Sequence, residues 1–310
     1  MTRALNGLHW QSPVDLNSLG SRAQVNACTV GFGSVLILSH SWWNPGGAQD
    51  YSNSEANIYW LERNRACNAG GASFNEVVIT RLYYPQQGLP GFPSDPGQLA
   101  AQWGPFIQWC QGQGVYNFVV LNEPDLEYNG QLWPVTADSQ SYMTGLAQAL
   151  RSQGLPGYPV YLGFPGPSGN IPPGGQYWAP YWTGYRDVIL NNYNNLAPHI
   201  YGQSDTGLEN AAAAAYADLT GWFPNFPIRY TEYGIPLNSP NLGGAPGNRV
   251  VRAQMYGNFV NWVRANQPWV YACHAFVARN TPDFDTSPNY YTLYDNETQI
   301  LAERVGCVGQ

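Results

Sequence analysis

YNFVVLNEP, residues Tyr116–Pro124, is the stretch that decides the fold of this chain. The residues from Phe118 to Leu121 are all apolar and two of them are β-branched, which is typical of a short strand buried on both faces. Glu123 stands where the run stops, and Pro124 turns the chain out of the strand. In parallel barrels the functional side chains lie at the carboxyl ends of the strands. The stretch therefore predicts a buried parallel strand that delivers Glu123 to the functional end of a sheet.

Similar strand-like runs recur along the chain and alternate with helix-like stretches. The alternation predicts an α/β fold, a (β/α)8 TIM barrel, that forms a single domain over residues 1–310 with long loops at the carboxyl ends of its strands. A doubly wound open sheet is the alternative, but no Gly-rich phosphate turn follows the first run. The predicted strands are Ala4–His9, Ser34–Ser39, Glu76–Tyr83, Tyr116–Leu121, Pro159–Phe164, Leu196–Tyr201, Ile228–Glu232 and Val270–Phe276. The predicted helices are Gln98–Gln111, Ser139–Ser152, Leu208–Trp222 and Asn248–Asn266, with a terminal helix near Glu297–Val305.

The composition excludes several classes of function. All 13 basic residues are arginine, so the chain has no lysine for a Schiff base or for a Walker-type phosphate loop. The net charge of −7 argues against nucleic acids and anionic membranes as partners. No apolar run reaches the roughly 20 residues of a membrane span. We expect a monomer, and the aromatic content of 15% fits either a sugar-binding cleft or core packing.

Cysteine usage and the N-terminus bear on cofactors and location. The five cysteines are widely spaced, without a C-x-x-C pair or a Cys/His cluster, so we expect no zinc site. No Asp/His ligand spacing suggests a catalytic ion, so we expect no metal and no cofactor, with a Ca²⁺ ion bound in a loop as the alternative. We expect either one or two disulfides or cysteines buried as free thiols. The N-terminal residues Met1–Leu5 lack the apolar stretch of a signal peptide. We expect a secreted protein whose signal segment is not part of the printed sequence, with the cytoplasm as the alternative.

A second carboxylate stands at the end of another strand. Glu232 follows the run Pro227–Thr231, and Gly234 lets the backbone turn sharply after it. Glu123 ends the fourth predicted strand and Glu232 lies on the seventh, so both side chains can converge over the barrel mouth. Two carboxyl groups about 5–5.5 Å apart are the acid/base and the nucleophile of a retaining glycosidase, whereas a spacing near 9 Å indicates inversion.

The two strand ends resemble those of clan A of the retaining glycoside hydrolases, which includes cellulases, mannanases, β-1,3-glucanases and xylanases. Asn-Glu-Pro-Asp at 122–125 and Thr-Glu-Tyr-Gly at 231–234 are most similar to the small single-domain endo-β-glucanases of that clan. The resemblance implies a polysaccharide or oligosaccharide substrate. It also implies that Glu123 is the acid/base, that Glu232 is the nucleophile and that Asn122 binds the sugar 2-hydroxyl. An exo-acting glycosidase or arabinofuranosidase of the clan and a non-catalytic carbohydrate-binding barrel are the alternatives.

The same resemblance implies supporting and binding residues. His199 would assist the acid/base, Tyr201 would orient the nucleophile, and Arg81 resembles the arginine that steadies it, although the clan usually supplies that arginine from the second strand. Phe276 stands where many members carry a tryptophan in the cleft floor. The residues predicted to contact substrate are mostly aromatic and lie at or just beyond strand ends, where loop packing is the alternative for each ring: Trp10, His40, Trp42, Trp43, Tyr83, Trp133, Trp178, Tyr233 and Phe276.

Overall fold

The computed structural model describes most of the sheet and the helices around it. The described residues are 4–10, 34–38, 78–82, 93–112, 114–123, 135–167, 178–236, 239–242 and 248–278. The terminal helix predicted near 297–305 lies outside these ranges.

Parallel strands occupy all eight predicted positions. The sixth position is divided into two short strands because Pro198 has no N–H group to donate to a neighbouring strand. The strands are β1 (Leu5–Trp10), β2 (Ser34–Leu38), β3 (Val78–Leu82), β4 (Asn117–Val120), β5 (Tyr161–Pro165), β6 (Asn195–Ala197), β7 (His199–Tyr201), β8 (Ile228–Gly234) and β9 (Val270–Ala278).

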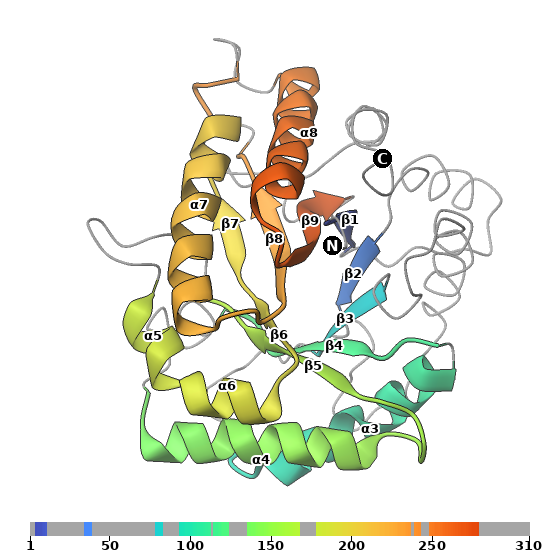
Figure 1. Ribbon diagram of the computed structural model, residues 1–310. Coiled ribbons are helices and arrows are strands. Elements are labelled where there is room, and N and C mark those ends of the chain that lie inside the picture. Colours follow the sequence, from blue (N-terminus) through green and yellow to red (C-terminus); the bar gives the residue numbers. More distant parts are fainter. Residues whose placement is uncertain are drawn as a thin grey trace, which may run out of the picture.

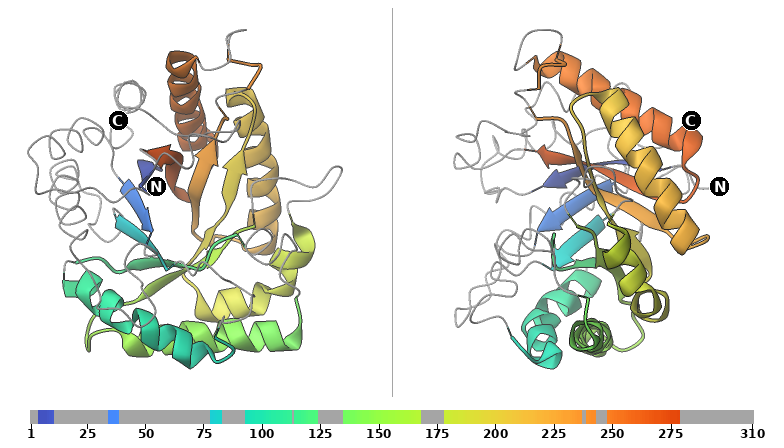
Figure 2. Two further views of the ribbon diagram at one scale, coloured as in Figure 1. Left: turned by 180° about the vertical axis from the view of Figure 1, so that it is seen from behind. Right: turned by 90° about the vertical axis from the view of Figure 1, so that its left-hand side faces the viewer.

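The strands close into a barrel. Their order is β6-β5-β4-β3-β2-β1-β9-β8-β7, and an additional pairing joins β6 to β8 through Leu196 and Ile228. Every pairing is parallel. The strands curl around a common axis in Figure 1, and the arrowheads in the right-hand view of Figure 2 point toward the same end. The predicted α/β barrel is thereby confirmed.

The described helices lie on the outer side of the sheet (Figures 1 and 2). Side-chain caps fix the starts of three of them: Thr136 forms a reciprocal capping box with Ser139, Ser204 accepts from the Gly207 N–H, and Asn248 accepts from the Val251 N–H. The short helices α5 and α6 lie between the fifth and sixth strand positions and were not among the predicted helices. The helices are α3 (Pro96–Gly112), α4 (Ala137–Gln153), α5 (Ala179–Gly184), α6 (Arg186–Asn192), α7 (Asp205–Trp222) and α8 (Arg249–Asn266).

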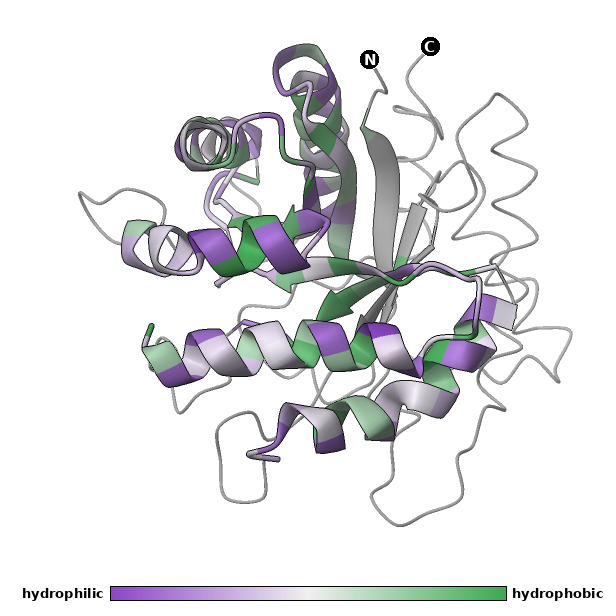
Figure 3. Cartoon of the chain, turned by 60° about the horizontal axis from the view of Figure 1, so that its bottom comes forward, coloured by the Kyte–Doolittle hydropathy of each residue, from purple (hydrophilic) through white to green (hydrophobic). Residues whose placement is uncertain are grey.

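Among the described residues, buried apolar side chains form two separate clusters. The large core lies between the sheet and the helices, whose residues alternate between hydrophobic and hydrophilic in Figure 3 as expected for helices buried on one face. A small second cluster joins Leu36, Val119 and Ala197, which come from the second, fourth and sixth strand positions. Layers built from alternate strands fill the interior of such barrels. Among the described helices, none combines the length and the apolar character that crossing a membrane requires.

Candidate active site

Glu123 lies three residues beyond the end of β4. Leu121 connects the strand to it with a φ angle of 64°, a left-handed conformation that is uncommon for leucine. The Leu121 N–H donates to the Leu82 carbonyl at 2.9 Å, and its side chain is buried in the large core. These contacts hold the strained residue in place, and the chain turns there so that Asn122 and Glu123 follow at the barrel mouth.

Glu232 lies within β8 and is paired with residues of the divided sixth strand. His199 is the register partner of Glu232, and Tyr201 is the partner of Gly234. His199 and Tyr201 are two residues apart, so their side chains leave β7 on the same face. The break at Pro198 therefore places an imidazole and a phenol next to the second carboxylate.

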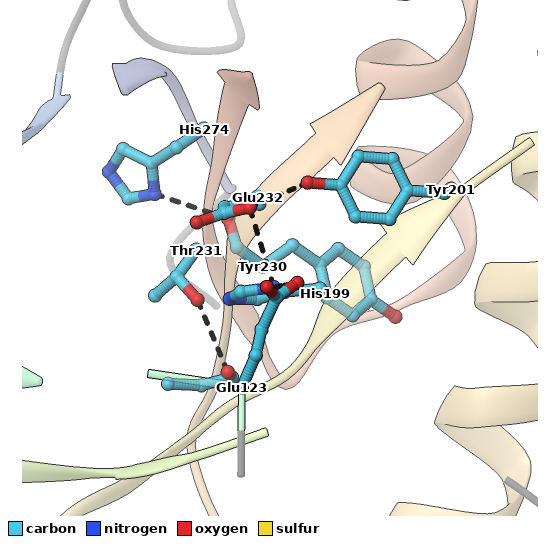
Figure 4. Close-up of polar contacts among 8 residues, drawn as sticks. Glu123, His199, Tyr201, Tyr230, Thr231, Glu232 and His274 are labelled. Atoms are coloured by element: carbon cyan, nitrogen blue, oxygen red, sulfur yellow. Dashed lines mark hydrogen bonds and ion pairs between the residues drawn. The ribbon is translucent and has the colours of Figure 1, made fainter. Parts of the chain in front are cut away.

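Two carboxylates, an imidazole and a phenol meet at the end of the barrel (Figure 4). His199 Nδ1 lies 2.8 Å from Oε1 of Glu123 and 3.4 Å from Oε2 of Glu232. The Tyr201 hydroxyl donates to the same Oε2 of Glu232 at 2.6 Å. One carboxylate oxygen of each glutamate and the His199 nitrogen all lie within 4.8 Å of one another. The predicted pair of glutamates is thus brought together, with two hydrogen-bonding groups between and beside them.

Burial differs between the two carboxylates. The Glu232 side chain is 4% exposed, and the Glu123 side chain is 14% exposed. His199, whose side chain is 2% exposed, contacts both. Glu232 is therefore the enclosed group, held by Tyr201, whereas Glu123 is the one that reaches solvent or a ligand more easily.

The three groups also form a donor set that a divalent ion such as Zn²⁺ would accept. Oε2 of Glu232 already receives the Tyr201 hydroxyl, and His199 Nδ1 already contacts both carboxylates. Hydrogen bonding within the cluster thus satisfies these atoms without an ion, and the arrangement suits proton transfer between oxygen and nitrogen.

The structure places three other predicted site residues, one of them by its backbone alone. Asn122 is half-buried beside Glu123. Phe276, also half-buried, comes from β9, and its ring meets that of Tyr201 edge-on with centroids 6.1 Å apart. Arg81 lies in β3, where its backbone pairs with Leu38 and Val119, and its side chain is not described.

Tyr233 does not occupy the position predicted for it. Instead of lining a cleft, its ring is fully buried and contacts Tyr256 and Phe259 of α8 with centroids 5.1 and 4.9 Å apart. Burial raises the pKa of its phenol well above the ordinary value. The physical reason is that neighbouring residues of a strand point to opposite faces, so that Glu232 faces the interior and Tyr233 faces the helices.

Of the other residues predicted to contact substrate, the structure describes Trp178 in full and Trp10 by its backbone alone. Trp178 is half-buried before α5, has a φ angle of 51° and packs against the large core. Trp10 ends β1, and its side chain is not described. The remaining predicted contacts lie outside the described residues: His40, Trp42, Trp43, Tyr83 and Trp133.

Two polar residues next to Glu232 were not predicted from sequence. Thr231 Oγ1 donates to the Ala197 carbonyl at 3.2 Å, and His274 Nδ1 lies 3.2 Å from the Tyr230 carbonyl (Figure 4). Both side chains are fully buried. A histidine within the otherwise apolar run of Val270–Phe276 was the signal that could have singled out His274.

Comparisons with known proteins agree with the barrel. No protein-family model and no curated protein matches the chain. Among solved structures, a fungal β-1,4-galactanase has a TM-score of 0.63 at 16% identity, covering 98% of this chain and 100% of the other. A GH10 endoxylanase from a sugarcane soil metagenome has a TM-score of 0.64 at 9% identity, covering 97% of both chains. A GH128 endo-β-1,3-glucanase from Lentinula edodes has a TM-score of 0.53 at 16% identity, covering 97% of this chain and 98% of the other. The chain shares the fold of these glycoside hydrolases, as its sequence predicted.

Proposed function

We propose that this protein is a retaining glycoside hydrolase that cuts β-linked polysaccharides, with an endo-acting β-glucanase as the specific activity. One observation carries the proposal: carboxylate oxygens of Glu123 and Glu232 lie within 4.8 Å of each other at the mouth of the barrel. This spacing suits a carboxylate that attacks the sugar directly, whereas an inverting enzyme separates its carboxyl groups by about 6.5–9.5 Å to admit a water molecule.

The first step forms a covalent glycosyl-enzyme. A carboxylate oxygen of Glu232 attacks the anomeric carbon and forms an ester bond as the glycosidic C–O bond breaks. The leaving oxygen takes the proton of Glu123. In this role Glu232 has to be ionised at the start, and the hydroxyl that Tyr201 donates to Oε2 stabilises the charged form.

The second step returns the enzyme to its starting state. Glu123, now a carboxylate, removes a proton from a water molecule whose oxygen attacks the anomeric carbon, and the Glu232 ester bond breaks. His199 contacts both carboxylates through Nδ1 and would orient Glu123 in both steps. Two inversions at one carbon give retention of configuration.

The choice of an endo-β-glucanase rests on weaker support. The motifs at 122–125 and 231–234 are most similar to those of small endo-β-glucanases, and one of the solved barrels described above is an endo-β-1,3-glucanase. A release of oligosaccharides of several lengths at early times would agree with endo action, whereas a single small product would indicate exo action.

The test is a screen of β-1,3-glucan, β-1,4-glucan, xylan, mannan and β-1,4-galactan with detection of new reducing ends. On the glycan that is cut, we expect E123Q and E232Q each to lose at least about 10³-fold in kcat. E209Q changes a glutamate on the outer helix α7, is the matched control and should keep full activity.

Two outcomes would overturn the proposal. Activity of E123Q and E232Q equal to that of the unmodified protein on every cleaved glycan would remove both glutamates from the reaction. An inverted product anomer, read by proton NMR immediately after cleavage, would exclude double displacement. A 2-deoxy-2-fluoro glycoside should label Glu232 covalently, and peptide mapping locates the label.

A further inference from the structure

Strand β8 contains one residue more than its neighbours just where Glu232 lies. On the β9 side, Tyr230 pairs with Cys273 and Tyr233 pairs with Ala275, so Thr231 and Glu232 together face the single residue His274. On the other side, β8 advances four residues from Ile228 to Glu232 while the divided sixth strand advances three, from Leu196 to His199. This two-against-one arrangement is a β-bulge, a feature that is rare in parallel sheets and that re-aims side chains near active sites.

The bulge explains how Glu232 faces the barrel interior. Tyr230 and Tyr233 both point outward, since the Tyr230 hydroxyl donates to Gln267 at 2.7 Å and both rings contact Phe259 of α8. In a regular strand, residues three apart point to opposite faces. The extra residue restores Tyr233 to the helix side and leaves the carboxylate of Glu232 on the inner side.

Hydrogen bonds tie the bulge to both neighbouring strands. Thr231 Oγ1 donates to the Ala197 carbonyl, and the Thr231 N–H donates to the Pro198 carbonyl, both at 3.2 Å. On the opposite side, His274 Nδ1 lies 3.2 Å from the carbonyl of Tyr230, the residue at which the bulge begins. A carbonyl only accepts, so this hydrogen bond requires a hydrogen on Nδ1.

We propose that His274 is a positioning residue whose Nδ1–H holds the β8 bulge in the shape that aims Glu232 at the reacting carbon. The proposal rests on the proposed function in that it takes Glu232 as the nucleophile. The imidazole is fully buried and comes from the strand paired to β8 at the bulge, so it acts on the backbone that carries Glu232 rather than on the sugar. Figure 4 shows His274 on one side of Glu232 and Tyr201 on the other.

Two substitutions of His274 separate this hydrogen bond from simple packing. H274N keeps an N–H donor at the same number of bonds from Cβ as Nδ1, whereas H274L has no donor. We expect H274L to lose about 10- to 100-fold in kcat with KM nearly unchanged, because a small misplacement of a reacting group slows the chemical step. H274N should retain activity within about threefold, since the bulge is still held.

Equal losses of kcat in H274N and H274L, or a loss confined to KM, would overturn the proposal. Imidazole ¹H–¹⁵N NMR of the unmodified protein provides a second readout, in which the His274 signals are identified by their disappearance in H274N. A hydrogen on Nδ1 supports the proposed contact, and a bare Nδ1 overturns it. This readout does not depend on activity, so a protein that cuts none of the five glycans would refute the proposed function while the spectrum still decided the contact.

Discussion

At the scale of single residues, His199 and Tyr201 connect the two glutamates. The sequence predicted a strand over Leu196–Tyr201, and the resemblance to clan A implied supporting roles for both residues; two residues apart in a strand, they lie on the same face. The sequence could not predict that His199 Nδ1 would approach Glu123 at 2.8 Å and Glu232 at 3.4 Å, since those distances depend on three strands at once. The contacts between residues on different strands are the part of the site that the sequence alone could not predict.

Removal of the Tyr201 hydroxyl tests the contact with Glu232. In Y201F the ring that meets Phe276 is kept, but Oε2 of Glu232 loses a donor at 2.6 Å. A hydrogen bond to a charged group contributes about 1.5–3 kcal/mol, so we expect kcat to fall about 10- to 100-fold. Steady-state kinetics on the glycan identified by the screen provide the measurement.

The control for Y201F is Y216F. Tyr216 lies on α7, and its hydroxyl accepts from the Trp269 N–H at 3.4 Å, away from the two glutamates. Its substitution should leave kcat unchanged. A Y201F protein with the kcat of the unmodified chain would show that the hydroxyl has no part in the reaction.

At the scale of elements, the strand positions were predictable and the irregularities were not. Apolar runs that end in Gly, Pro or polar residues located all eight strand positions, because strands covered on both faces need apolar side chains throughout. Pro198 was predicted to lie inside one continuous strand, yet its missing N–H divides that strand into β6 and β7. The β8 bulge left no local sequence signal, because it is defined by the register with both neighbours.

The junction at Pro198 depends on a close backbone contact from β5. Gly166 follows β5 and donates its N–H to the Ala197 carbonyl at 3.0 Å, and a Cβ at this position would lie 2.5 Å from Pro198 Cα. Backbone atoms cannot rotate away, so we expect G166A to lower the free energy of unfolding by about 2–3 kcal/mol. Urea denaturation followed by circular dichroism measures the loss.

G221A is the matched control for G166A. Gly221 lies near the end of α7, and a Cβ there would meet nothing within 4 Å. Alanine should raise the free energy of unfolding by about 0.5–1 kcal/mol, because glycine loses more conformational freedom in a helix. If G166A were as stable as G221A, the contact with the Pro198 junction would not constrain the barrel.

At the scale of the whole molecule, the core between sheet and helices contains ionisable groups that folding keeps neutral. Burial raises the pKa values of the Tyr193 and Tyr233 phenols and of the Cys273 thiol. The Tyr193 hydroxyl donates to the Met143 carbonyl at 3.0 Å, so the phenol keeps its proton in a satisfied position. These groups are buried in their protonated forms, so the folded state holds their protons more tightly than the unfolded state does.

This arrangement predicts that stability falls in alkaline solution. The unfolded chain releases these protons as the pH rises past about 8.5 for cysteine and about 10 for tyrosine, whereas the folded chain keeps them. The folded state then binds more protons, and the free energy of unfolding falls by about 1.4 kcal/mol per pH unit for each such group. Urea denaturation at several pH values from 7 to 11 provides the measurement.

Y193F tests how much Tyr193 contributes to the fall of the free energy of unfolding with pH. It removes one titrating phenol, so the decline above pH 10 should be shallower by the contribution of a single group. A free energy of unfolding that stays constant or rises between pH 9 and 11 would contradict the prediction.

The closure of the barrel at Leu196 and Ile228 affects how the protein behaves in concentrated solution. A sheet with open edges exposes unpaired N–H and C=O groups that can template pairing with another chain, and a closed ring exposes none along its seam. Association through strand edges would first require the ring to open. For this protein, self-association into β-rich aggregates should therefore follow the rate of barrel opening rather than the frequency of collisions between folded molecules.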